Sequence, residues 1–227
     1  MRLWHCRFAR SFRCLWTLEE LTVRPNYELT TMRFPPRVFH KDYLKTNVLG
    51  TIPFFEDGKQ CRMTESVAIC QYIAQRYGGS DLIVGPDEPD FAAYLNWLAH
   101  SDATLTFPQT VVLRYVVQEP GVADAAAQGY ARWYVARLRL LNAALEDGRD
   151  FLCSDRFTLA DICVTYALYF GTTLQLPGES LPLSARYKPH TRTYLDRMMA
   201  RDGWAKAAAA QSESEEPLSA GEAKPEI

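Results

Sequence analysis

A group of polar side chains at the start of a predicted helix is the part of this sequence best suited to chemistry. Thr64, Glu65 and Ser66 directly precede an apolar pattern of helical spacing that ends at Tyr77. The first turn of a helix presents backbone N–H groups that have no partner within the helix, and such groups bind anions. Because a serine hydroxyl stands beside them, we expect this helix start to bind a carboxylate.

A predicted hairpin that contains a proline precedes this helix. Residues 52–55 are apolar and rich in β-formers, Asp57-Gly58 is a two-residue hairpin signal, and Cys61 and Met63 continue the second strand. Since proline cannot donate a hydrogen bond, Pro53 belongs at a strand edge or start, where the backbone groups of its neighbours are free to bond an extended peptide. Taken singly, these signals also fit an ordinary edge hairpin and a surface helix.

The hairpin and the helix together resemble the glutathione-binding half of the cytosolic glutathione transferases. The resemblance is carried by Ile52-Pro53, Asp57-Gly58 and Thr64-Glu65-Ser66-x-Ala68-Ile69, and it extends over about residues 1–205. It implies that Pro53 is cis, that the backbone of Ile52 pairs with the glutathione cysteine, and that Glu65 and Ser66 hold the γ-glutamyl carboxylate. The implied protein is a homodimer that uses glutathione as co-substrate in detoxification.

Glutathione transferases gain most of their rate by making the glutathione thiolate available at neutral pH. A free thiol has a pKa of about 8.5, and lowering it by roughly two units requires about 3 kcal/mol of preferential thiolate stabilisation. A hydroxyl donor, a helix N-terminus and nearby cations supply this together. The resemblance places the donor at the start of the first helix, in the loop from Cys6 to Arg13.

Ser11 is the only hydroxyl residue in that loop, and we predict that it donates to the thiolate. The alternative is that Ser11 caps the first helix, a common role of serine. Arg7, Arg10 and Arg13 either raise the local positive potential or form a solvated helix face, and Arg10 is the nearest of them to the hydroxyl. Phe8 completes the predicted catalytic loop.

The loop departs from the usual patterns of the family. Ala9 occupies the position of the theta-like catalytic serine, Arg10 occupies that of the beta-class cysteine, and the preceding strand has no tyrosine. Cys6, at the end of that strand, either forms a mixed disulfide with glutathione or is a small buried hydrophobe. The loop has no Cys-x-x-Cys motif, so we do not expect dithiol oxidoreductase chemistry.

Other predicted contacts to the substrates follow from the resemblance. The glycyl carboxylate of glutathione needs a cation, for which Arg37, His40 and Lys41 are candidates, and Asp102 is placed to meet the glutathione amino group from the partner subunit. Arg114 is predicted to stabilise negative charge on the electrophile. The alternatives are a surface charge for Asp102 and core packing for the aromatic residues. The predicted wall of the electrophile site consists of aromatic residues, namely Phe8, Phe107, Tyr115, Tyr166 and Phe170.

The elements that must position these residues fall into two halves. Strands over 2–6 and 27–31 flank a helix over 11–21, which predicts a right-handed βαβ unit. With the hairpin and its helix, this is an α/β thioredoxin-like βαβ-ββα domain with a mixed four-stranded sheet. It covers residues 1–79 and is followed by a linker over 80–88.

The second half is predicted to be all-helical over residues 89–210. Helical spacing runs over 91–114 with an interruption at Phe107-Pro108, and again over 124–147 and 192–199. A capping box from Thr158 to Asp161 begins the helix that should be buried. Residues 211–227 are polar and acidic, and we expect a disordered tail there.

The composition excludes several classes of protein. The 227 residues are 48% hydrophobic and 23% charged with a net charge of −2, which is typical of a globular protein and gives no electrostatic signal for nucleic acid or a membrane. The six cysteines lack the short paired spacing of a disulfide framework or a metal site. We therefore expect no metal. The first residues also lack the apolar region of a signal peptide, so we expect a cytoplasmic protein.

Three functions are therefore open. The first is a glutathione transferase that acts on small hydrophobic electrophiles. The second is a glutathione-dependent isomerase of the maleylacetoacetate type, whose serine-serine-x-cysteine loop this sequence lacks. The third is a noncatalytic protein that uses the same fold for binding.

Overall fold

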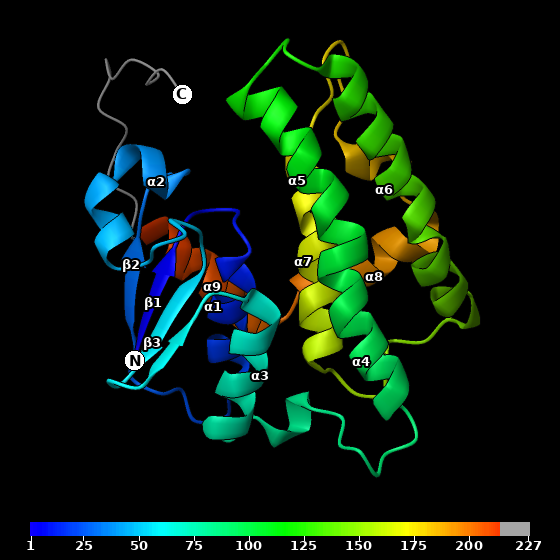
Figure 1. The fold of residues 1–227 in the computed structure, drawn as a ribbon. Helices are drawn as coiled ribbons and strands as arrows, with labels where there is room; N and C mark the ends of the chain where they lie inside the picture. Colours follow the sequence, from blue (N-terminus) through cyan, green and yellow to red (C-terminus); the bar gives the residue numbers. More distant parts are fainter. Residues whose placement is uncertain (214–227) are drawn as a thin grey trace. The chain divides into compact units, whose positions relative to one another are not determined.

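A mixed four-stranded sheet with helices forms the first part of the chain in the computed structural model, which describes residues 1–213 (Figure 1). Strands β1 and β2 are parallel, and β3 pairs antiparallel with both β1 and β4, in the order β2-β1-β3-β4. The predicted thioredoxin-like fold is confirmed. Its elements in chain order are β1 (Arg2–His5), α1 (Ser11–Glu20), β2 (Glu28–Thr31), α2 (Pro36–Phe39), a 3-10 turn (Lys41–Lys45), β3 (Phe54–Asp57), β4 (Cys61–Met63) and α3 (Ser66–Arg76).

Alternating and helical apolar patterns build the core of this unit. Leu3 on β1 lies opposite Phe55 on β3, and both side chains are fully buried. Helix α1 buries Leu15 and Leu18 at helical spacing, and α3 buries Ile69 together with Ile73. Tyr72 and Tyr77 both donate hydrogen bonds to Asp57, which ties α3 to the hairpin.

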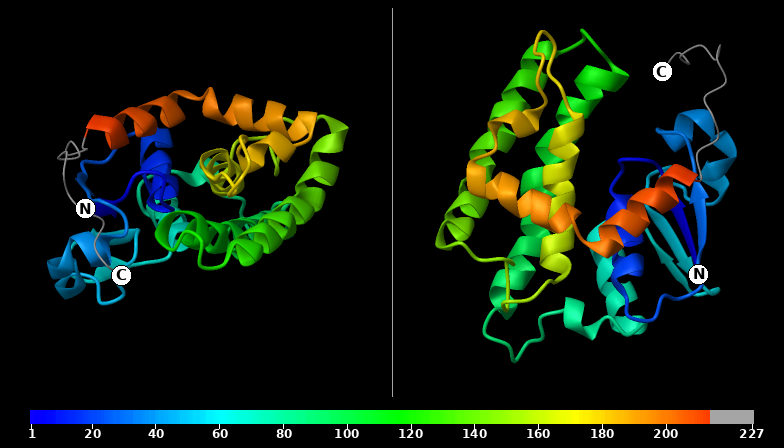
Figure 2. Two further views of the ribbon diagram at one scale, coloured as in Figure 1. Left: turned by 90° about the horizontal axis from the view of Figure 1, so that it is seen from above. Right: turned by 180° about the vertical axis from the view of Figure 1, so that it is seen from behind.

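A final helix, α9 (Asp202–Glu213), was not predicted, and it belongs to the first unit. Figure 2 shows α9 running beside α1. Trp204 is buried, and its ring centroid lies 4.7 Å from that of Phe12 and 4.9 Å from that of Trp16. The helical domain predicted to run to residue 210 therefore ends near Arg201, because this aromatic contact holds the last helix on α1. The predicted tail lies outside the described residues from residue 214 onward.

The second unit, residues 80–201, is helical as predicted. The predicted interruption near Pro108 appears as a wider π-helical turn just before it, because proline has no N–H for the regular hydrogen bond. Among the described residues, no helix has both the length and the apolar composition of a membrane span. The elements are α4 (Phe91–Ala99), a π turn (His100–Thr106), α5 (Phe107–Leu113), a second π turn (Arg114–Gln118), α6 (Asp124–Ala144), α7 (Leu159–Thr173) and α8 (Pro189–Met199).

Helix α7 is buried along most of its length and begins with the predicted capping box. The Thr158 side chain accepts from the backbone of α7, and the Asp161 carboxylate accepts from the Thr158 backbone N–H at 2.9 Å. Asp161 also accepts from the Leu152 N–H at 3.0 Å and from the Tyr194 hydroxyl at 2.8 Å. The Thr158 hydroxyl is a fourth donor, at 3.2 Å. Burial raises the pKa of Asp161 to about 6 despite these four hydrogen bonds.

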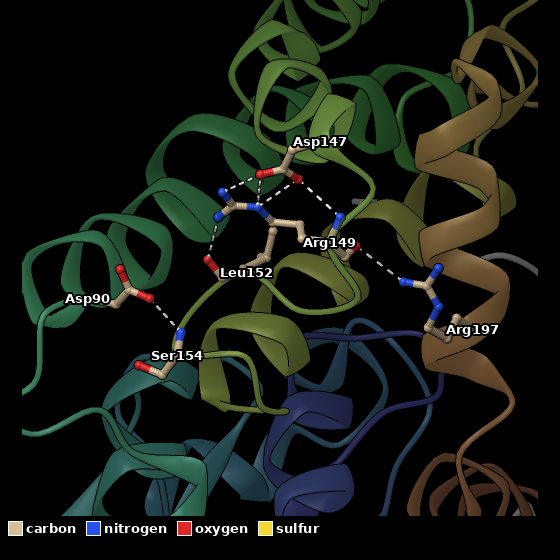
Figure 3. Close-up of polar contacts among 6 residues, drawn as sticks. All are labelled: Asp90, Asp147, Arg149, Leu152, Ser154 and Arg197. Atoms are coloured by element: carbon tan, nitrogen blue, oxygen red, sulfur yellow. Dashed lines mark hydrogen bonds and ion pairs between the residues drawn. The ribbon is translucent and has the colours of Figure 1, made fainter.

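The loop before α7 is held by charged side chains, as Figure 3 shows. Arg149 pairs with Asp147 at 2.6 Å, and Arg197 of α8 donates to the Arg149 carbonyl at 3.4 Å. The Ser154 N–H donates to Asp90 at 2.6 Å. The charged side chains in these contacts have partners within the protein, so we interpret them as structural and assign no ligand to this loop.

Candidate functional site

The start of α3 carries the candidate anion site. Ser66 is the first helical residue and is buried, and the exposed Glu65 precedes it in an extended conformation. The guanidinium of Arg13 donates to Ser66 Oγ at 3.0 Å, although Arg13 is itself fully buried. The Cys14 thiol donates to the Ser66 carbonyl at 3.6 Å. Helix N–H groups, a hydroxyl and a buried cation thus meet at one place, which favours a carboxylate.

Arg13 is a site residue whose role sequence reasoning missed. The sequence places it only among three arginines near the first helix, whereas the structure aims it at a residue 53 positions away. The sequence offered only a weak signal, in that Arg13 stands between the apolar Phe12 and Cys14, and the structure shows that nearly all residues of α1 are buried. A buried arginine requires polar partners, and this is the reason to look for a site around it.

The peptide between Ile52 and Pro53 is cis, as the resemblance implies. Pro53 is buried, and Ile52 packs against the aromatic cluster of Trp4, Tyr43 and Phe54. The carbonyl just before this dipeptide, that of residue 51, accepts from Tyr43 Oη and from the side-chain amide of residue 47, both at 2.9 Å. These contacts fix the chain on the N-terminal side of the proline.

The sheet register brings the cis proline to the loop that precedes α1. Trp4 lies opposite Phe54 in the antiparallel pair of β1 and β3. Since the two strands are antiparallel, the start of β3, directly after Pro53, and the end of β1, directly before Cys6, lie at the same end of the sheet. The predicted backbone site and the predicted thiol-activating loop are therefore neighbours at one end of the sheet.

Ser11 is the first residue of α1 and is fully buried. Its hydroxyl lies 2.8 Å from His5 Nδ1, and its other described contacts, with the backbone N–H and carbonyl of Cys6, are longer at 3.4 Å. No side-chain capping bond is formed at this helix start among the described residues, so the capping role weighed for Ser11 is not seen. The proposed thiolate donor instead has a histidine partner that the sequence did not indicate.

The loop itself is strained at Phe8, which has a φ of 60°. A bulky residue rarely adopts this left-handed conformation, and such strain is concentrated at functional sites. The Arg7 guanidinium lies 4.8 Å from the centre of the Phe8 ring, and Arg10 is partly exposed. Burial raises the pKa of the Cys6 thiol to about 12, so this cysteine stays protonated at neutral pH and acts as a buried hydrophobe.

The three candidates for the glycyl carboxylate differ in their surroundings. Arg37 on α2 and Lys41 on the following turn are exposed. His40 Nε2 lies 3.1 Å from the Arg33 backbone N–H and accepts from it, which requires that ring nitrogen to be unprotonated. Gly50 has a φ of +59°, and a Cβ at that position would lie 2.8 Å from Arg37 Cβ, so its backbone packs closely under α2.

The predicted electrophile residues of the second unit make three sets of contacts. Tyr166 and Phe170 are buried on α7 and stack with centroids 6.0 Å apart. Arg114 pairs with the Glu119 carboxylate at 2.7 Å and lies 5.9 Å from the Tyr115 ring centre. The half-exposed Phe107 contacts the rings of residues 130 and 133 on α6. The predicted partner-subunit contact, Asp102, is partly exposed in the first π turn.

Comparisons with known proteins identify the family of the chain. The family model for the glutathione S-transferase N-terminal domain matches residues 1–75, and the model for the C-terminal domain matches residues 135–202. The chain is 33% identical to a glutathione S-transferase-like protein LUC7 of a Fusarium species, over 50% of this chain and 51% of that protein. It is 25% identical to glutathione S-transferase 3 of Schizosaccharomyces pombe, over 74% and 72% of the two chains.

Some relatives have other names and are longer. The chain is 29% identical to elongation factor 1-gamma of Prunus avium over 70% of its own length but only 36% of that protein. The chain thus spans about half or less of the length of the first curated relatives that it matches.

Solved structures share the fold. A ternary complex of BphK, a bacterial glutathione S-transferase, superposes with a TM-score of 0.77 at 21% identity, covering 93% of this chain and all of that one. A sphingomonad glutathione S-transferase complexed with glutathione gives the same TM-score and identity, over 93% of this chain and 99% of that one.

Proposed function

This chain belongs to the glutathione S-transferase family, and we propose that it is an enzyme that joins the glutathione thiolate to small hydrophobic electrophiles. In this reaction a carbon–sulfur bond forms as a carbon–halogen bond breaks, or as an epoxide or activated alkene opens. We further propose a cytoplasmic homodimer that acts in detoxification. Glutathione is the co-substrate.

The observation that carries this proposal is the contact between Arg13 and Ser66 at the start of α3. The γ-glutamyl end of glutathione has an α-carboxylate, which is the group that helix N–H donors and a cation-bound hydroxyl favour. The exposed carboxylate of Glu65 is placed one residue earlier, where it suits the neighbouring ammonium group of the same ligand. The two charges of the γ-glutamyl group thus have complementary partners on adjacent residues.

The remaining roles extend from this anchor. Ile52, beside the cis Pro53, supplies backbone hydrogen bonds to the glutathione cysteine, and Ser11 donates to the thiolate with help from the charge of Arg10. The glycyl carboxylate is bound by Arg37 and Lys41, with His40 as the third candidate, and Asp102 of a partner subunit meets the amino group. The residues proposed to contact the electrophile are Phe8 in the first unit and, in the second unit, Phe107, Arg114, Tyr115, Tyr166 and Phe170.

A conjugation assay on the full chain tests the proposal. With glutathione and an activated aryl chloride, we expect the thioether and free chloride to appear in equal amounts, at rates that saturate with glutathione. Replacing the exposed Glu65 by alanine should raise the KM for glutathione, while the same change at the exposed Asp42 should not. Absence of product from a protein with a native circular dichroism spectrum would contradict the enzyme proposal.

A noncatalytic binding protein is the second candidate. The similarity to elongation factor 1-gamma favours it, as does the burial of Ser11, which leaves the proposed donor out of contact with solvent. The same experiment separates the two candidates. A protein that binds glutathione in a titration but forms no thioether belongs to the binding class.

A further inference from the structure

A cationic surface follows β2 and includes α2. This α2 cationic surface, residues 32–41, contains two arginines, a lysine and a histidine but no acidic residue. Its Arg37 and Lys41 side chains are exposed. The next acidic residue, Asp42, already pairs with Lys45 at 2.6 Å, and neither Arg37 nor Lys41 forms an ion pair within residues 1–213. The surface therefore has positive charge that its own neighbours do not neutralise.

The two parts of the first unit differ in the sign of their charge. Residues 1–79 contain 12 lysines and arginines and 7 aspartates and glutamates, a net charge of +5, although the whole chain has a net charge of −2. Residues 214–227, which follow α9, contain 4 glutamates and 1 lysine, a net charge of −3. This acidic segment is thus complementary in charge to the unit from which it continues.

Helix α9 runs antiparallel to α1. Its second residue, Gly203, lies at the end of α1, because a Cβ atom there would be 2.5 Å from Glu20 Cδ. Trp204 then packs on Trp16 and on Phe12, which lies near the start of α1. Helices of 12 and 10 residues are about 18 and 15 Å long, so α9 ends close to the start of α1.

The start of α1 and the α2 cationic surface lie at the same end of the sheet. Strands β1 and β2 are parallel, and α1 follows the end of β1 as α2 follows the end of β2. Figures 1 and 2 both show the end of α9 at this end of the sheet. Three strand spacings of about 4.8 Å make the four-stranded sheet about 15 Å wide. A chain of 14 residues spans up to about 46 Å, so the acidic segment is long enough to reach α2.

We propose that the acidic segment, residues 214–227, binds the α2 cationic surface and competes there with the glycyl carboxylate of glutathione. This inference rests on the proposed function, in which Arg37 and Lys41 bind that carboxylate. Both ligands offer carboxylates to the same two side chains, so one excludes the other. The segment is tethered, which gives it an effective concentration on the order of millimolar and compensates for weak ionic contacts. It therefore lowers the apparent affinity for glutathione without abolishing binding.

Zero-length carbodiimide coupling of the full chain tests the contact without glutathione. The reagent joins a lysine Nζ atom to a carboxylate in contact with it, and peptide mass mapping identifies the pair. We expect an amide between Lys41 and a glutamate of the acidic segment, which is lost in about 1 M NaCl, where the Debye length is about 3 Å.

Lys59 is the matched control for the coupling. It is an exposed lysine in the turn after β3, and because β3 is antiparallel to β1, that turn lies at the opposite end of the sheet. Absence of an amide between Lys41 and the acidic segment, or equal coupling of the segment to Lys41 and Lys59, would overturn the proposal.

Calorimetric titration with glutathione tests the competition. Neutralising the acidic segment should lower the Kd for glutathione about 3- to 10-fold at low salt, as a few screened surface ion pairs would give, and the difference should vanish in about 1 M NaCl. The substitutions are Glu215→Gln, Glu216→Gln, Glu222→Gln and Glu226→Gln.

A second variant with the same change of net charge is the control. It neutralises exposed acidic residues of the second unit by Asp81→Asn, Asp87→Asn, Glu146→Gln and Asp196→Asn. An unchanged Kd in the first variant, or an equal fall in the control, would overturn the proposal. If no form of the protein binds glutathione, the proposed function fails, while the coupling of Lys41 still decides whether the acidic segment binds α2.

Discussion

The buried guanidinium of Arg13 gives the start of α3 its chemical character. We expect Arg13→Met, which keeps much of the side-chain length, to weaken glutathione binding by about 10- to 100-fold. This range corresponds to loss of one hydrogen bond to a charged group, about 1.5–3 kcal/mol. Titration of the variant with glutathione measures the change in Kd. Arg76→Met is the control, because this exposed arginine lies at the other end of α3. Equal effects of the two substitutions would remove Arg13 from the site.

The neutral state of His5 makes folding stability depend on pH. The unfolded chain takes up a proton at this residue near pH 6.5, whereas burial lowers the folded pKa to about 4. Between these values the unfolded state binds more protons, so the contribution of His5 to stability is lost as the pH falls from 6.5 toward 4. The loss approaches about 3 kcal/mol.

Urea unfolding of wild type and His5→Asn across this range measures the effect. The relevant quantity is the difference in unfolding free energy between the two proteins, because Asp161 also titrates in this range. Burial raises the pKa of Asp161 to about 6, so its contribution to stability increases as the pH falls over part of the range. His190→Asn, in the second unit, serves as the control. A pH slope that is the same in wild type and His5→Asn would contradict the neutral buried histidine.

Helix α9 stabilises the first unit mainly through one aromatic side chain. Trp204 packs edge-on against Phe12 and Trp16 of α1. We expect Trp204→Ala to lower the free energy of unfolding by about 3–5 kcal/mol, as is usual for a large aromatic residue removed from a core. Trp133→Ala, at a tryptophan with 40% exposure, should have a much smaller effect. Denaturant unfolding followed by circular dichroism measures the unfolding free energy of both variants. A loss for Trp204→Ala no larger than that for Trp133→Ala would contradict the role of α9 proposed here.

The start of α7, like α9, is stabilised by identifiable side chains, here those of the capping box. Thr158→Ala removes the capping hydroxyl and should cost about 0.5–2 kcal/mol of unfolding free energy. Thr172→Ala, at the other end of the same helix, is the matched control, because that hydroxyl bonds back to the Tyr169 carbonyl within the helix. Thermal unfolding compares the two variants. A larger loss for Thr172→Ala would contradict the capping account.

At the scale of the whole molecule, the fold was predictable because its signals are local. Asp57-Gly58 sets the hairpin, and the capping box from Thr158 to Asp161 begins the buried helix, each within a few residues. Helix α9 was missed, although its run of alanines after Trp204 strongly favours a helix. Residues up to 210 were assigned to the all-helical second half with no helix named after residue 199, and only the packing on α1 shows where this segment belongs.

The candidate site was predictable only in part. The backbone and helix-start residues Ile52 and Ser66 follow from motifs, but the contacts of Arg13 and His5 depend on tertiary structure. Arg13 meets a residue on another helix, and His5 on β1 pairs with Ser11 at the start of α1. No spacing rule in the sequence joins these positions.

The γ-glutamyl site at the start of α3 is the central claim, and calorimetric titration of the full chain with two ligands tests it most directly. Reduced glutathione and cysteinylglycine share the thiol and the glycyl carboxylate, and only glutathione has the γ-glutamyl group. We predict saturable binding of glutathione with a Kd at least about tenfold below that of cysteinylglycine, since the missing group would lose at least one charged hydrogen bond. Equal affinity for the two ligands, or no binding of glutathione, would contradict the account.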